Sequence, residues 1–255
     1  MSQARQTVRD IDGFPVRGLA VTYGDRFRLH RHTHPWAQLV YAASGVMVVE
    51  TPDAAWLVPP TRAIWVPGGT PHEIEMRGVV AMRTLYLAPA PDARLETCRA
   101  LEVAPLLREL ILHIVRLEML EQGRPEHERL EALLLDLLAE GETAPLQLPL
   151  PADPRARAFA ETLLADPGST TPLEVLARGS GASFRTLQRL FAAETGLPLE
   201  TWRGRARMQQ AVVSLSNGAS VTTAALDAGY QSPSAFIAAF KRAFGVTPAR
   251  WRARP

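Results

Sequence analysis

The feature that most constrains how this chain can fold is an internal repeat in its C-terminal half. Four residues recur there at a constant offset of 49 positions: Phe191, Gly196, Trp202 and Arg203 are matched by Phe240, Gly245, Trp251 and Arg252. Self-similarity over such a length is typical of two successive copies of one supersecondary unit. A stretch with helical periodicity, residues 198–215, lies between the copies and is expected to join them.

Each copy is predicted to be a helix–turn–helix unit. In both, a serine precedes residues that are apolar at spacings of three and four, which is typical of an N-cap followed by an amphipathic helix. These serines are Ser183 and Ser232, and Gly181 and Gly229 interrupt the chain just before them. A capping box with proline at the first helical position, residues 171–174, begins the first copy. We therefore predict an all-α C-terminal domain.

The charge of the chain is distributed unevenly between its halves. Residues 1–150 hold 15 Arg against 19 acidic residues, a net charge of −4, whereas residues 151–255 hold 13 Lys and Arg against 7 acidic residues, a net charge of +6. A basic half of this size is a candidate for binding a polyanion such as nucleic acid. The alternative is a chance asymmetry on an ordinary protein surface.

Two stretches of the basic half are distinctive. Residues 229–248 read GYQSPSAFIAAFKRAFGVTP, and residues 186–196 read TLQRLFAAETG. They resemble the AraC/XylS family of bacterial transcription regulators, and the resemblance covers about residues 155–255, the whole DNA-binding domain of that family. It implies sequence-specific binding to double-stranded promoter DNA.

The predicted outward faces of the two second helices are suited to this role. A recognition helix docks by an apolar stripe and reads base edges with the opposite face. Arginine pairs with guanine and glutamine with adenine, whereas small side chains contact thymine methyl groups. We expect base or phosphate contacts from Arg185, Thr186, Gln188, Arg189, Gln231, Ser232, Ser234, Ala238, Lys241 and Arg242. Arg203, Arg205 and Arg207 are expected to form a solvated face of the joining helix, with contact to DNA phosphates as the alternative.

The N-terminal half has a different organisation. Residues 14–89 form short β-branched and aromatic runs punctuated by Gly and Pro, a pattern typical of a sandwich or small barrel. Residues 101–141 change to the helical period and predict two helices. We therefore expect a sensor domain at residues 1–100, a helical dimerisation segment at 101–141, a proline-rich linker at 142–154 and the DNA-binding domain at 155–255. The alternative for the two helices is packing on their own barrel.

Four of the six histidines lie in the strand-rich segment. The spacing of His32, His34, Gln38 and Gly45, followed by Pro67, Gly69 and His72, resembles the two motifs of the cupin fold. This resemblance implies an N-terminal β-barrel of the double-stranded β-helix type. Three imidazoles and an amide oxygen, from His32, His34, His72 and Gln38, could hold a divalent ion such as Zn, Ni, Fe or Mn. The alternative is a barrel mouth in which these histidines hydrogen-bond each other and a ligand.

A small-molecule effector is expected in the same barrel. Its candidate contacts are His30, Trp36, Tyr41 and Trp65, of which the aromatic residues could equally be core fillers. A single cysteine, Cys98, is typical of a reducing compartment, and no uninterrupted apolar run is long enough to cross a membrane. We therefore expect a cytoplasmic protein.

The chain is thus predicted to be an α+β protein, a cupin β-barrel followed by an all-α domain with two helix–turn–helix units. We interpret it as a DNA-binding transcriptional regulator, not an enzyme, whose operator binding responds to a small molecule or metal. Its expected partners are promoter DNA, the effector, a second copy of the chain and RNA polymerase. Two alternatives remain: a metal-dependent cupin oxygenase or isomerase with a helical appendage, and an adaptor that binds no DNA.

Overall fold

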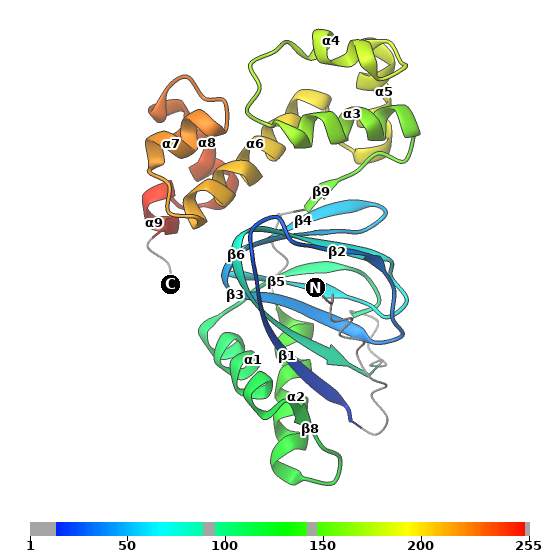
Figure 1. Ribbon diagram of the computed structural model, residues 1–255, viewed down its shortest axis with the longest axis vertical. Helices are drawn as coiled ribbons and strands as arrows, with labels where there is room; N and C mark the ends of the chain where they lie inside the picture. The colour runs from blue at the N-terminus through cyan, green and yellow to red at the C-terminus, as the bar shows by residue number, and fades with distance from the viewer. Residues whose placement is uncertain (1–13, 89–94, 142–146, 253–255) are drawn as a thin grey trace, which may run out of the picture.

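The chain folds into a β-rich N-terminal domain and a helical C-terminal domain (Figure 1). The computed structural model describes residues 14–88, 95–141 and 147–252. The strands are β1 (Val16–Tyr23), β2 (Arg28–His32), β3 (Ala37–Glu50), β4 (Ala54–Val58), β5 (Arg62–Val66), β6 (His72–Leu87), β7 (Arg99–Glu102), β8 (Met119–Leu120) and β9 (Gln147–Pro149). No helix in the described part of the chain combines the length and apolar character that a membrane crossing needs.

Two long strands, β3 and β6, organise the antiparallel sheet because they pair along almost their whole length. In one half of the sheet, β5 pairs with the first half of β3 and β7 pairs with β5, while β1 pairs with the second half of β6 and β8 pairs with β1. In the other half, β4 pairs with the second half of β3 and β9 pairs with β4, while β2 pairs with the first half of β6. The register between β3 and β6 shifts around Ser44, beside Gly45 with φ of +78° and Gly78 with φ of +95°. The sheet bends there into two half-sheets.

The N-terminal domain is β-rich as expected, but the predicted β-barrel is not closed. Among the described strands, β7 and β8 stand at the two ends of the main sheet path and do not pair with each other. The bends in β3 and β6 already bring the inner faces of the two half-sheets together. A shared core then fills the space between them, and it includes Met47, Trp56, Ile74 and Met82. Burial of these side chains stabilises the fold without requiring the sheet edges to join.

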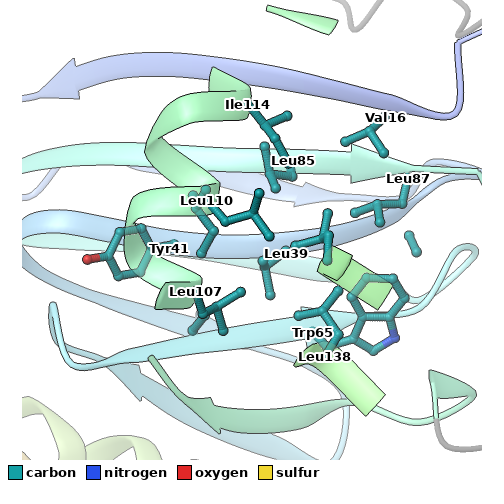
Figure 2. Packing of buried hydrophobic residues seen from close by; sticks show 14 of the residues in the cluster. Val16, Leu39, Tyr41, Trp65, Leu85, Leu87, Leu107, Leu110, Ile114 and Leu138 are labelled. Carbon is teal, nitrogen blue, oxygen red and sulfur yellow. The ribbon is translucent and has the colours of Figure 1, made fainter. Parts of the chain in front are cut away.

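The helices α1 (Pro105–Leu117) and α2 (Pro125–Glu140) cover the outer face of the half-sheet that lies away from the C-terminal domain (Figure 1). Figure 2 shows Leu107, Leu110 and Ile114 of α1 pointing at side chains of the sheet, among them Leu39 and Leu85. The apolar faces of both helices are therefore largely used within the chain, which is the alternative that the sequence left open.

Part of the predicted linker also belongs to the sheet. Residues 147–149 form β9 and pair with β4, and the Leu150 amide donates to the Asp53 carbonyl at 2.8 Å. Residues 142–146 of the predicted linker lie outside the described part of the chain. The segment that leads into the C-terminal domain is consequently tied to the N-terminal sheet just before that domain begins.

The C-terminal domain contains both predicted helix–turn–helix units. Its helices are α3 (Pro154–Ala165), α4 (Leu173–Leu176), α5 (Phe184–Thr195), α6 (Leu199–Ser216), α7 (Val221–Asp227), α8 (Pro233–Phe244) and α9 (Pro248–Arg252), with a 3-10 turn at Ala177–Gly179. Ser183 and Ser232 cap α5 and α8 as predicted. The predicted capping box is wrong, because Pro172 is the N-cap of α4 and no side chain caps that helix.

We expect Gly45→Ala to reduce the free energy of unfolding by about 1–3 kcal/mol more than Gly123→Ala, because steric overlap is added to a backbone strain that the two positions share. A Cβ at Gly45 would overlap the Val79 carbonyl oxygen and lie 2.9 Å from the Val80 Cα. Gly123 has nearly the same φ, +77°, but nothing within 4 Å of its added Cβ. Urea unfolding of the two variants separates overlap from backbone strain, and equal losses would contradict this account of the bend.

Candidate functional site

The second helix of the first unit, α5, presents a polar face away from the core. Its apolar stripe of Leu187, Leu190 and Phe191 is buried, and the ring of Phe191 packs edge-on against Trp202 of α6. The predicted contact residues Arg185, Gln188 and Arg189 are all exposed. Thr186 is half-buried, and its hydroxyl bonds the capping hydroxyl of Ser183 at 2.9 Å. The helix therefore offers two guanidinium groups and one amide to solvent.

The corresponding helix of the second unit, α8, is docked in the same way by Phe236 and Phe240. Its exposed predicted contact residues are Gln231, Ser232, Ser234, Ala238, Lys241 and Arg242. Ser232 already uses its hydroxyl to accept a hydrogen bond from the Ala235 amide. Ile237 of the same helix is 37% exposed and lies outside the buried stripe. The exposed face of α8 is thus small and less polar than that of α5.

The joining helix α6 fixes the first unit through two arginines, which corrects the prediction that they are solvated. Arg203 is only 8% exposed, and its guanidinium donates to the carbonyl oxygens of Ser169 and Thr171. Arg207 donates to the Pro167 and Ser169 carbonyls at 3.1 and 2.9 Å. These bonds hold the loop between α3 and α4 against α6. Of the three arginines on this helix, Arg205 is the exposed one.

A second cluster of functional side chains lies at one end of the rolled sheet. His32 ends β2, His34 lies in the following turn, and Gln38 and His72 lie near the starts of β3 and β6. The three histidines offer ring nitrogens that lie within 4.8 Å of one another. Within the described part of the chain, this is the group of histidine, cysteine and acidic side chains close enough to share an ion. The predicted ligands are thus brought together.

The backbone fixes the tautomer of all three rings. Each Nδ1 lies against a carbonyl oxygen: that of His32 against His30 at 2.8 Å, that of His34 against Trp36 at 2.8 Å, and that of His72 against Thr70 at 2.9 Å. A carbonyl oxygen can only accept, so each Nδ1 must carry a hydrogen. In the neutral rings the Nε2 atoms are therefore lone-pair acceptors.

The amide of Gln38 is fixed as well. Thr84 donates its hydroxyl hydrogen to the Leu39 carbonyl and so accepts a bond from the Gln38 Nε2 at 2.9 Å. The Gln38 Oε1 then faces the Nε2 atoms of His34 and His72, both at 3.1 Å. Sequence reasoning missed Thr84 and also Tyr86, whose hydroxyl lies 3.3 Å from the amide Nε2 of Gln38. The sequence pattern that could have identified them is a pair of side chains with hydroxyl groups at alternate positions, 84 and 86, of an otherwise apolar strand.

The cluster is therefore a group of acceptors facing one another. Burial, and to a smaller extent the neighbouring His32 and His34, lower the pKa of His72 to about 4. The neutral ring is thus favoured, and it has no hydrogen to place between its Nε2 and the Gln38 Oε1. A cation at this point would satisfy the lone pairs together, which is the arrangement that a divalent ion with neutral ligands requires.

A β-bulge sets which side chains face the cluster. Leu29 pairs with Ile74 and His32 with His72, so β2 carries one extra residue between these pairs. A bulge of this kind re-aims the side chains beside it. His32 and His34, although two residues apart, do not lie on one continuous strand, because β2 ends at His32 and a turn places His34 beside it.

The candidate effector residues are dispersed. Tyr41 and Trp65 are fully buried in the core beneath α1 and α2, and the Trp65 indole donates to the Leu95 carbonyl at 2.7 Å. His30 is exposed, and Trp36 is half-buried beside the cluster. Tyr41 and Trp65 are thus not brought to the histidines.

Comparisons with known proteins match both halves of the chain. The profile of the AraC-like ligand binding domain matches residues 15–139, and that of a helix-turn-helix domain matches residues 176–254. The HTH-type transcriptional regulator NimR of Escherichia coli K12 is 33% identical over 223 residues, which are 88% of this chain and 82% of NimR. The HTH-type transcriptional regulator RipA of Corynebacterium glutamicum is 39% identical over 100 residues, 39% of this chain and 30% of RipA.

Among solved structures, ToxT of Vibrio cholerae O395 aligns with a TM-score of 0.40 at 8% identity, over 93% of this chain and 97% of ToxT. The DNA-binding domain of AdpA, solved in complex with a target DNA, aligns with a TM-score of 0.37 at 32% identity, over 40% of this chain and 91% of that domain.

The buried arginine generates a prediction. We expect Arg203→Met to lower the free energy of unfolding by about 1–3 kcal/mol, because hydrogen bonds from a charged donor are lost and the Thr171 carbonyl loses this partner. Arg205→Met removes the same charge from an exposed position of the same helix and should change stability by less than about 0.5 kcal/mol. Chemical denaturation measures both, and equal effects would contradict the structural role of Arg203.

Proposed function

The chain belongs to the AraC-like family of helix-turn-helix transcriptional regulators, and we propose that its binding to promoter DNA is controlled by a ligand held in the N-terminal domain. The observation that carries this proposal is the pair of docked helices, α5 and α8, joined by the single helix α6. A continuous helix restrains the spacing of two units that must enter successive segments of one major groove, about 34 Å apart for one helical turn.

We propose that the first unit supplies most of the sequence specificity. Its exposed Arg185, Gln188 and Arg189 can make bidentate contacts with guanine and adenine, whereas α8 exposes mainly Ser234 and Ala238 at the corresponding face. Lys241 and Arg242 are then phosphate contacts, which fix register without reading sequence.

We propose that the ligand site of the N-terminal domain is the histidine cluster. His32, His34, His72 and Gln38 would hold a divalent ion such as Zn, Ni, Fe or Mn, and the fixed acceptor atoms support this assignment. Such an ion supplies a Lewis-acidic charge with open positions for a small molecule. The exposed His32 and the half-buried Trp36 stand where that molecule would enter.

We propose sensing, not turnover, for this cluster. Metal-dependent hydrolytic or oxidative chemistry uses a general base beside the ion. In the described residues the cluster contains histidines but no carboxylate. Glu73 follows His72 directly, but its side chain lines a cleft on the opposite side of the sheet.

Further partners belong to the proposal. Leu106, Leu117 and Leu133 stay exposed on α1 and α2 and offer an apolar surface to a second copy of the chain. A regulator that activates transcription would also contact RNA polymerase. Since it acts on promoter DNA, we place the protein in the cytoplasm.

Replacing Arg189 by alanine should weaken binding to the preferred operator by about 1–3 kcal/mol and relax preference at one base pair. The operator is first selected from random duplexes with the full chain, and affinities are then measured by fluorescence anisotropy. Lys241→Ala is the matched control, since loss of a phosphate contact weakens all sequences equally and lowers the salt slope by about one. An equal loss for Arg189→Ala on every sequence would contradict base reading.

The purified chain should bind about one Zn²⁺ or Co²⁺ per molecule, because one set of four ligands is present. We expect His32→Ala, at an exposed position, to weaken this binding by at least about tenfold. His30→Ala is the control, since the His30 backbone carbonyl, and not its ring, supports His32. A content below about 0.2 equivalents after incubation with the metal would show that the histidines only hydrogen-bond.

A further inference from the structure

The two domains meet across the outer face of the half-sheet that carries β2 and β4. Val46 and Leu57 of this face share a buried core with Met208 and Val212 of α6. Beside this apolar contact lies a cleft of about 510 Å³, lined by charged side chains from both domains. The sensor sheet therefore contacts the helix that joins the two DNA-reading units.

One carboxylate in this cleft is shared between the domains. Glu50 of β3 forms an ion pair with Arg157 of α3 and a second, at 3.4 Å, with Arg31 of β2. Arg157 also donates to the Pro52 carbonyl at 3.1 Å. The side chains of Arg157 and Glu50 are only 19% and 29% exposed, so solvent screens this pair less than a surface pair. Since α3 packs on α5 through Phe159 and Phe191, Arg157 links Glu50 to the first unit.

The same strands carry the histidine cluster on their other side. Arg31 immediately precedes His32, and Glu73 immediately follows His72. Glu73 is directly opposite Glu50 in the pairing of β6 with β3. Arg31, Glu50 and Glu73 line the interdomain cleft, whereas His32 and His72 face the ring cluster. One thickness of sheet therefore separates the histidines from the ion pair.

We propose that Glu50 couples the histidine cluster to the DNA-binding domain, so that a divalent cation among the histidines weakens the Glu50–Arg157 contact. This inference rests on the proposed cation site. Four neutral ligands leave the charge of the ion uncompensated, and that charge attracts Glu50 and Glu73 but repels Arg157 and Arg31. Docking of α3 through Arg157 therefore becomes less favourable when the site is filled. By reciprocity, loss of Arg157 must strengthen cation binding.

Cobalt affinity of the full chain, followed by visible absorption at low salt, tests the coupling. We expect Arg157→Met to tighten Co²⁺ binding about threefold to tenfold. This is the size expected when a positive charge is removed from the other side of the sheet, where solvent partly screens its repulsion of the ion. Glu50→Gln, which keeps the shape of the side chain, should weaken it. Arg155→Met is the matched control: Arg155 lies on the same helix, pairs with Asp153 of its own domain and should leave Co²⁺ affinity unchanged.

A second readout is operator affinity. Addition of Co²⁺ should change it in the parent chain and in Arg155→Met but not in Arg157→Met, whose contact is already absent. Circular dichroism and thermal unfolding confirm that each variant is folded. If Co²⁺ binds but Arg157→Met behaves as Arg155→Met in both measurements, the coupling is wrong and the cation site stands. If the parent chain binds no Co²⁺, the cation site fails and the coupling fails with it.

Discussion

The antiparallel pairing of β3 with β6 is the interaction on which the rest of the structure depends. These two strands bend together beside Gly45 and Gly78, and the bend turns one sheet into two facing layers. Their inner side chains form the core between the layers, while the outer side chains receive α1 and α2 on one half and the DNA-binding domain on the other. The starts of the same strands carry Gln38 and His72. Core, histidine cluster and domain interface are therefore consequences of a single pairing.

Within the DNA-binding domain, α6 has a comparable role. It packs on the first unit through Trp202 and on the second through Val212 and Leu215. Arg203 and Arg207 add hydrogen bonds from charged donors to carbonyl oxygens that would otherwise lack these partners. The arginines of this domain thus differ in their surroundings, since Arg203 and Arg207 stabilise it from inside while Arg185 and Arg189 are exposed to solvent. Net charge alone does not distinguish them.

The two candidate sites of the molecule follow different physical rules. The DNA-reading faces are open and polar, and their energy comes from groups that remain solvated until DNA arrives. The histidine cluster is partly buried, and its lone pairs are already oriented by backbone carbonyls and by Thr84. Such orientation reduces what a ligand must reorganise on binding. The ion pair of Glu50 with Arg157 lies between these two sites and belongs to both domains.

The sequence by itself determined the helix–turn–helix units, their caps at Ser183 and Ser232, the joining helix and the identity of the clustered histidines. These features depend on local periodicity, capping and motif spacing, which act over a few residues. Only the tertiary structure decided that the sheet stays open, that Tyr41 and Trp65 face α1 and α2, that Arg203 is buried, and that Arg157 reaches Glu50. Those outcomes depend on which faces of distant segments meet. A one-residue bulge such as that in β2 is enough to exchange the two faces of a strand, and no local pattern specifies it.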